Sequence, residues 1–196
     1  MITRRKIAID MDDVLADFHT GFMNYNNLIY GTSLRREDFT TYQFNELWGG
    51  TVEEAIQRVN DFHRSVYFRE ILPLSDSIDS VGTLSKGNEL VIITSRPTFT
   101  REETARWLDL FFKEKFSGIF YSSNHYSGTT GKSKSEFCKE LGLSVLIDDS
   151  LDYVKQCPPL GISGILFGDY PWNQNGNLPS GIVRVKNWKE VLERLS

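Results

Sequence analysis

The chain has 196 residues, of which 40% are hydrophobic, 13% aromatic and 24% charged, as in an ordinary globular domain. The 22 Lys and Arg residues are outnumbered by 26 Asp and Glu residues and form no basic cluster, which excludes a surface for a nucleic-acid polymer. Two cysteines support neither a disulfide scaffold nor a Cys-ligated zinc site. The apolar stretch after Arg4-Arg5-Lys6 is cut short by Asp10, so we expect no secretory signal, no membrane span and a cytoplasmic protein.

Short apolar runs bounded by turn or acidic residues predict buried strands, and amphipathic stretches between them predict helices. The predicted strands are, in chain order, 6–11, 90–94, 119–121, 145–147, 162–167 and a weaker 182–185. The predicted helices are 76–86, 101–116, 134–141, 152–156 and 188–195. Apolar strands without alternation, separated by helices, indicate an α/β fold with a central parallel sheet covered on both faces.

One segment, 18–75, does not follow this alternation of strands and helices. It is rich in aromatic residues and has helical spacing at 16–28 and 52–66, but it contains no strand run. We predict a small helical insert after the first strand, with 1–17 and 76–196 forming the core. An insert of this length in a compact domain is more often a lid or a binding element than a loop without function.

Carboxylates follow two of the predicted strands. Asp10, Asp12 and Asp13 come where the first strand ends, and Asp148 and Asp149 follow the strand at 145–147. The carboxyl ends of parallel strands lie along one crevice, so the two groups are expected to meet. Carboxylates this close repel one another unless a cation lies among them, and oxygen ligands alone favour a hard ion such as Mg²⁺.

Further polar residues are expected at the same edge of the sheet. Thr94 and Ser95 close the second strand and offer hydroxyl and backbone donors to a phosphoryl oxygen. Lys134 begins a predicted helix, where an ammonium group suits an anion, although Lys132 competes for this role. Together with the carboxylates, these residues form a complete set for phosphoryl transfer through an aspartyl-phosphate.

The order and spacing of these residues resemble those of the haloacid dehalogenase (HAD) superfamily of phosphohydrolases. The matching motifs are Asp10-Met11-Asp12, Thr94, Lys134 and Asp148-Asp149. The segments IDMDDVLADF and KSEFCKELG resemble, within that superfamily, the 5'(3')-deoxyribonucleotidase group, or cytosolic type C 5'-nucleotidase family, and its bacterial relatives. The resemblance implies a Rossmann-like HAD fold with a helical cap at 18–75.

The resemblance also implies roles for the acidic residues. Asp10 would attack phosphorus, and Asp12 would protonate the leaving alcohol and then activate water. Mg²⁺ would be held by Asp10, the backbone carbonyl of Asp12 and Asp149, with Asp148 in support. Thr94, the Ser95 amide and Lys134 would hold the phosphoryl oxygens.

The sequence departs from the animal nucleotidases at two places near these motifs. Asp13 stands where they have glycine, and Arg96-Pro97 follows the Thr-Ser pair differently. Asp13 could cap the following helix instead of contacting the site. Whether Asp13, Arg96 or His125 contacts the substrate is left open by the sequence. His19, His63 and His125 form no metal-ligand pattern, and His63 is expected on the surface or packed against the insert.

The expected reaction is Mg²⁺-dependent hydrolysis of a small phosphomonoester, for which we favour a 5'-(deoxy)ribonucleoside monophosphate. Phe18, Phe44 and Trp48 of the insert are the candidates for stacking on its base. Two alternatives remain at this point: a phosphatase for another metabolite such as a sugar phosphate, and a non-catalytic binding module. The oligomeric state is also open, a homodimer included.

Overall fold

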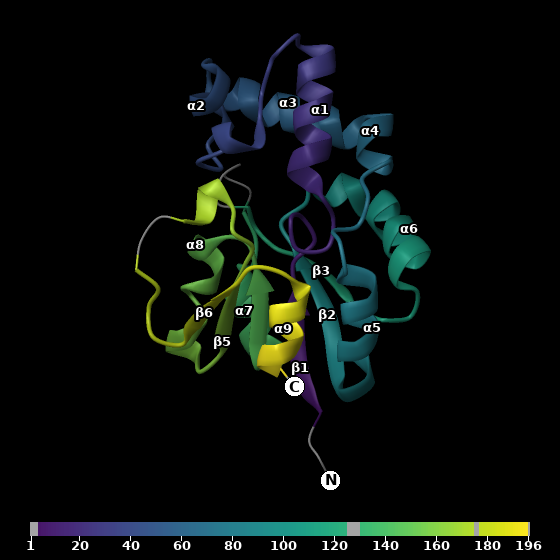
Figure 1. The fold of residues 1–196 in the computed structure, drawn as a ribbon, viewed down its shortest axis with the longest axis vertical. Coiled ribbons are helices and arrows are strands. Elements are labelled where there is room, and N and C mark those ends of the chain that lie inside the picture. Colours follow the sequence, from purple (N-terminus) through teal and green to yellow (C-terminus); the bar gives the residue numbers. More distant parts are fainter. Residues whose placement is uncertain (1–3, 125–129, 175–176, 196) are drawn as a thin grey trace.

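The computed structural model describes residues 4–124, 130–174 and 177–195. Its centre is a six-stranded sheet with all neighbouring strands parallel, in the order β3-β2-β1-β4-β5-β6 (Figure 1). The strands are β1 (Arg5–Ile9), β2 (Asn88–Thr94), β3 (Ile119–Tyr121), β4 (Val145–Asp148), β5 (Ser163–Phe167) and β6 (Ile182–Val185). β1 lies between β2 and β4, where the order of the strands reverses, and ligands of open α/β sheets bind at such a point.

Helices cover both faces of this sheet. Ile7 and Ile9 of β1 face a core shared with α5 (Ser77–Gly87), α6 (Arg101–Phe112) and α9 (Trp188–Leu195). Ala8, between them, faces a second core with α7 (Lys134–Glu140) and α8 (Leu151–Val154). Successive strand residues point to opposite faces, so a strand with apolar residues at every position needs both layers. The predicted α/β class is therefore confirmed.

Between β1 and α5 the chain forms a helical insert, which lies beyond the carboxyl edge of the sheet (Figure 1). Its helices are α1 (Phe18–Ile29), the short 3-10 helix η1 (Arg36–Asp38), α2 (Phe44–Trp48), α3 (Val52–Arg64) and α4 (Val66–Arg69). Phe22 and Phe62 are fully buried at its centre, and their ring centroids lie 5.3 Å apart. α3 begins at a capping box formed by Thr51 and Glu54, which satisfies backbone donors at its start.

The chain enters and leaves the insert along two adjacent segments. The Asp17 amide donates to the Leu72 carbonyl at 3.0 Å, and the Leu74 amide donates to the Leu15 carbonyl at 2.7 Å. The two connections are therefore hydrogen-bonded to each other at the base of the insert.

In the part of the chain that the structure describes, three further 3-10 helices lie in the connections of the core. They are η2 (Thr98–Thr100), η3 (Pro158–Leu160) and η4 (Pro171–Asn173). None of the helices in the described ranges is both long and apolar enough to cross a membrane.

Element ends differ from the predicted ends where a turn intervenes. β1 stops at Ile9 because the Met11 carbonyl accepts hydrogen bonds from the Leu15 and Ala16 amides, which curls the chain away from the sheet. α6 ends at Phe112, four residues early, and Glu114 beyond it has a φ of 58°, which a right-handed helix cannot contain. η1, α2 and α4 are too short to leave a periodic pattern and were not predicted.

Candidate active site

The acidic cluster forms where β1 and β4 end side by side. The Asp10 amide donates to the Ile147 carbonyl at 2.9 Å, which continues the pairing of the strands for one residue. Asp148 and Asp149 follow at the end of β4, and both are buried. One carboxylate oxygen from each of Asp10, Asp148 and Asp149 lies within 4.8 Å of the others.

Lys134 joins this cluster from the first turn of α7. Its Nζ lies 2.7 Å from Asp10 Oδ1 and 2.7 Å from Asp148 Oδ2, and its side chain is 1% exposed. Burial alone would lower the pKa of Lys134, but the two carboxylates outweigh it and hold the pKa above its ordinary value. Lys132 is exposed and pairs with Glu140 instead. Of the two competing lysines, the structure brings Lys134 to the acidic cluster.

The carboxylates carry more negative charge than Lys134 can balance. Burial raises the pKa of Asp10, and despite the opposing charge of Lys134 the value reaches about 7, with Asp148 and Asp12 adding to the rise. Burial, and then the charges of Asp148, Asp13 and Asp10, raise the pKa of Asp149 well above its usual range. Buried carboxylate oxygens with unfavourable mutual charge are the donor set that a hard divalent cation relieves.

Asp149 is held by side chains from outside its strand. Its Oδ2 accepts a hydrogen bond from Trp172 Nε1 at 2.8 Å and another from the Tyr42 hydroxyl. Trp172 belongs to η4 of the core, whereas Tyr42 belongs to the insert. The insert thus reaches one of the clustered carboxylates directly.

Asp12 lies apart from this cluster and faces Arg96. The Arg96 Nη2 is 2.5 Å from Asp12 Oδ1, and the Arg96 Nε is 3.1 Å from each Asp12 oxygen. The Asp12 side chain is 23% exposed, whereas that of Arg96 is 3% exposed. Asp12 is therefore accessible from the cavity, with its carboxylate paired on the opposite side.

Asp13 is fully buried and turned toward the insert. Its Oδ2 lies 2.5 Å from His19 Nδ1, and its Oδ1 lies 3.4 Å from Nη2 of Arg36. The His19 ring stacks on Trp172, with centroids 3.9 Å apart. Asp13 thus connects the loop after β1 to α1 and η1.

Thr94 is the last residue of β2 and Ser95 follows it, next to the loop that carries Asp10. Thr94 is 1% exposed, and its Oγ1 accepts a hydrogen bond from the Arg96 amide at 3.2 Å. The Ser95 hydroxyl is engaged with Ser122 Oγ and the Tyr153 hydroxyl, each at 3.0 Å. The Ser95 side chain is thus tied to the wall of the site.

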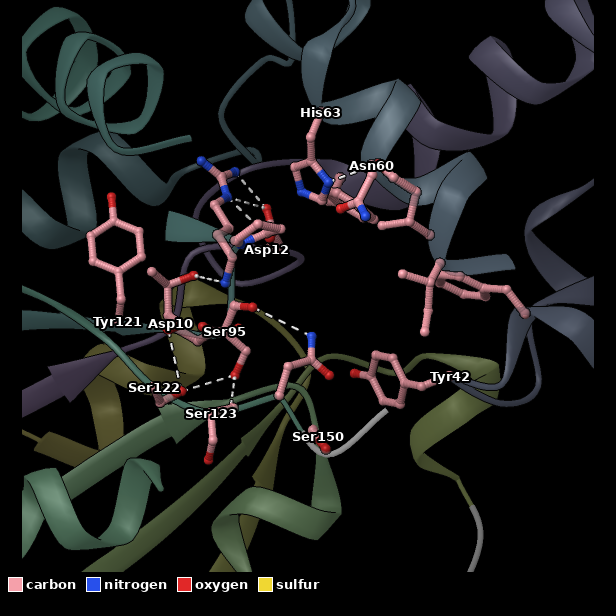
Figure 2. A pocket seen from close by; sticks show the side chains of 18 of the residues that line it. Asp10, Asp12, Tyr42, Asn60, His63, Ser95, Tyr121, Ser122, Ser123 and Ser150 are labelled. Carbon is pink, nitrogen blue, oxygen red and sulfur yellow. Dashed lines mark hydrogen bonds and ion pairs between the residues drawn. The ribbon is translucent and has the colours of Figure 1, made fainter. Parts of the chain in front are cut away.

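A cavity of about 940 Å³ opens between the sheet edge and the insert. Its lining includes Asp10 and Asp12 from the core and, from the insert, Phe18, Phe44, Asn60 and His63. In Figure 2, Asn60 and His63 come from the helix above the cavity and point toward the side of Asp12. The Trp48 ring lies 5.9 Å from that of Phe44, centroid to centroid, and Trp48 is not among the residues that line the cavity.

Sequence reasoning did not assign His63, Tyr42 or Asn60 to this cavity. Of the two expectations for His63, packing against the insert is confirmed, since its ring lies 4.8 Å from that of Phe68 and 5.6 Å from that of Phe18, and it also lines the cavity. Its spacing from Phe62 and Val59 on a helix could have placed it near the apolar face, but no local pattern shows what that face covers. Tyr42 and Asn60 gave no signal, because their contacts depend on how the insert folds over the sheet. His125 lies outside the described residues.

Comparisons with known proteins agree with this geometry. The family model for "5' nucleotidase, deoxy (Pyrimidine), cytosolic type C protein" matches residues 4–195. A protein of Bacillus cereus named as a candidate nucleotidase is 25% identical over 191 residues, covering 95% of each chain.

Two solved structures share the whole fold. A haloacid dehalogenase-like hydrolase of Streptococcus pneumoniae has a TM-score of 0.70 at 19% identity, covering 100% of both chains. A HAD hydrolase of Bacillus subtilis, solved with bound magnesium, has a TM-score of 0.67 at 16% identity, covering 98% of this chain and 99% of its own. Because this family model matches residues 4–195, nearly the whole chain, the chain belongs to the cytosolic type C 5'-nucleotidase family.

Proposed function

We propose that this protein hydrolyses 5'-(deoxy)ribonucleoside monophosphates through an aspartyl-phosphate on Asp10. The observation that carries the proposal is the placement of Asp10: beside Lys134, within the acidic cluster, and at the floor of a cavity with an aromatic wall. We further propose that 18–75 acts as the cap of this site and that 1–17 with 76–196 forms the catalytic core.

The proposed reaction has two steps. An Asp10 carboxylate oxygen attacks phosphorus, the bond from phosphorus to the ester oxygen breaks, and that oxygen takes a proton from Asp12. Water then attacks the phosphorus and gives a proton to Asp12, while the bond from Asp10 to phosphorus breaks. The sum is ester and water converted to alcohol and inorganic phosphate, with both aspartates restored.

Lys134 and the end of β2 supply the contacts for the phosphoryl group. The Lys134 ammonium, already 2.7 Å from Asp10 Oδ1, attracts the phosphoryl oxygens to the side of the nucleophile. The Thr94 hydroxyl and the Ser95 amide are the further donors that we assign to these oxygens.

The same edge of the sheet fits a magnesium ion. Asp10, Asp149 and the backbone carbonyl of Asp12 would hold it, with Asp148 in support, because these oxygens are the hard ligands that Mg²⁺ prefers. When bound, the ion offsets the negative charge of the phosphoryl group. Trp172 and Tyr42 keep the Asp149 carboxylate oriented for this role.

The choice of a nucleotide rests on the cavity and on the relatives. A volume of about 940 Å³ exceeds what a phosphoryl group needs, and the Phe18 and Phe44 rings that border it suit a planar base. The family description and the name of the Bacillus cereus relative both specify a nucleotidase. The word cytosolic in the family description supports a cytoplasmic site of action.

The test is phosphate release from a panel of nucleoside and deoxynucleoside monophosphates, sugar phosphates and p-nitrophenyl phosphate, with Mg²⁺ present. We expect the nucleotides to have the highest kcat/KM. Asp10→Asn should abolish turnover, because an amide is a far weaker nucleophile and the covalent route is lost. A preference for sugar phosphates would overturn the substrate, and an active Asp10→Asn variant would overturn the mechanism.

A further inference from the structure

Arg96 has no part in the reaction as set out above, yet it makes the closest contacts to Asp12. We propose that Arg96 is a positioning residue that anchors Oδ1 of Asp12 and leaves Oδ2 as the oxygen that exchanges the proton with the leaving alcohol and with water. This inference rests on the proposed function, because it assigns a role within that reaction.

The contacts distinguish the two oxygens of Asp12. Oδ1 is approached by two nitrogens of Arg96, Nη2 at 2.5 Å and Nε at 3.1 Å. Oδ2 shares the single Nε hydrogen, at a distance of 3.1 Å. Because a hydrogen-bonded oxygen is a poorer proton acceptor, the oxygen with fewer donors is the one available to the substrate.

Arg96 is itself held from three sides. Its Nη1 donates to Thr104 Oγ1 of α6 at 3.2 Å, and its own amide donates to Thr94 Oγ1 at 3.2 Å. The guanidinium carbon lies 4.8 Å from the centroid of the Phe68 ring, which belongs to α4 of the insert. A guanidinium that is 3% exposed and fixed by the core and the insert cannot follow a moving carboxylate, so the carboxylate is fixed instead.

This arrangement matters most where a proton must reach a poor leaving group. The 5'-alkoxide of a nucleoside requires a proton as its bond to phosphorus breaks, and an acid that is misplaced by a fraction of an ångström donates it inefficiently. The p-nitrophenolate ion leaves without much help. Loss of Arg96 should therefore affect the two kinds of ester unequally.

The experiment compares kcat/KM for a nucleoside monophosphate and for p-nitrophenyl phosphate in wild type, Arg96→Met and Arg96→Lys. Since kcat/KM reports the step that forms the aspartyl-phosphate, Arg96→Met should lose about a hundredfold with the nucleotide and less than about tenfold with the aryl ester. Arg96→Lys keeps the positive charge but lacks the planar guanidinium that donates two hydrogen bonds side by side. Its kcat/KM should therefore lie between those of wild type and Arg96→Met.

Two further comparisons separate positioning from structural support. In an Asp12→Asn background, Arg96→Met should change kcat/KM by less than about threefold, because the group that it positions is already gone. Arg106→Met, which removes an exposed arginine of α6 that pairs with Glu102 and Glu103, is the control and should keep the wild-type ratio between the two substrates.

Each remaining result overturns the inference. Equal losses on both esters in Arg96→Met, or a full additional loss in the Asp12→Asn background, would show that Arg96 only supports the site. If Arg96→Met does not fold, the same ratio and the same background test are read from Arg96→Lys. A wild type that hydrolyses p-nitrophenyl phosphate but no nucleotide would reject the proposed function, and this inference with it.

Discussion

Asp13 occupies a backbone conformation that glycine adopts more easily, with a φ of 55°. Its buried carboxylate explains why a side chain is present there: it contacts His19 of α1 and Arg36 of η1, which both belong to the insert. Contacts of a buried carboxylate with two such partners offset the modest cost of a left-handed residue. At this position, contacts that join the core to the insert outweigh the conformational advantage that glycine would have.

His63 is a buried imidazole whose ionisation opposes folding. Burial lowers its pKa from 6.5 to about 4, and the positive charges of Arg96 and Arg64 add to this, although the Asp12 charge and a hydrogen bond with the Val59 carbonyl act in the other direction. Between these two values the unfolded chain binds a proton at this site and the folded chain does not. Stability is therefore fully present above pH 6.5 and decreases as the pH falls toward 4.

His63→Leu should flatten this pH dependence. Between pH 7 and pH 4.5 the wild type should lose about 2 kcal/mol more of its free energy of unfolding than the variant, because only the wild type carries the titrating ring. Urea denaturation at the two pH values, monitored by circular dichroism, measures the difference. Parallel losses in both proteins would show that His63 does not stay neutral on folding.

The sequence predicted site residues whose position follows from strand ends. Thr94 and Asp148 are the last residues of their strands and Asp10 directly follows one, so their meeting followed from the parallel order of the sheet. Arg96 and His63 could not be assigned in this way. Their roles depend on which atoms face them across the boundary between core and insert, and a one-dimensional pattern does not contain that information.

At the scale of elements, α2 and α1 present aromatic rings to the cavity in different ways. Phe44 of α2 is half-buried and borders the cavity. Phe18 of α1 also borders it but is 6% exposed, with its ring 5.7 Å from that of Phe22 and 5.4 Å from that of Phe62. The Phe44 ring is thus the better placed for a base, and Phe18 also supports the core of the insert.

Phe44→Ala should lower kcat/KM for nucleoside monophosphates by about ten- to a hundredfold, because a stacked base contributes about 1 to 3 kcal/mol. Hydrolysis of p-nitrophenyl phosphate, which has no base, should change little. Phe111→Ala is the matched control, since this half-buried aromatic of α6 lies apart from the cavity lining. An equal loss on both substrates would assign Phe44 to the packing of the insert.

The elements of the core could be predicted more fully than those of the insert. Each core strand is a short apolar run whose ends are marked by turn or acidic residues, and each predicted run overlaps an observed strand. The insert has no such repeating pattern of apolar runs and boundaries, because α2 and α4 cover only one turn each and depend on tertiary contacts. The aromatic content of 18–75 indicated a small core there but not how its helices connect.

At the scale of the whole molecule, the acidic cluster should make stability depend on a divalent cation. Saturating Mg²⁺ should raise the melting temperature of EDTA-treated protein by about 5 to 10 °C, because a cation that binds only the folded state stabilises it. Asp149→Asn should lose most of this shift, and activity should disappear with EDTA and return with Mg²⁺.

Asp79→Asn, an exposed substitution on α5 outside the cluster, is the control and should keep the full shift in melting temperature. Equal shifts in Asp149→Asn and Asp79→Asn would place the cation elsewhere, and full activity in exhaustively chelated buffer would exclude a need for it.

The paired connections at the base of the insert make that segment exchangeable. Because the chain leaves the sheet and returns to it at hydrogen-bonded neighbours, the gap that any replacement must span is fixed, whatever its length. The entropy of closing a loop grows only slowly with the number of residues in it, so a larger, smaller or unrelated insert could be grafted there at little energetic cost to the sheet. Such a graft would leave Asp10, Thr94 and Lys134 where they are. Natural variation or protein engineering can thus change the insert, which faces the substrate, without moving the residues that act on the phosphoryl group.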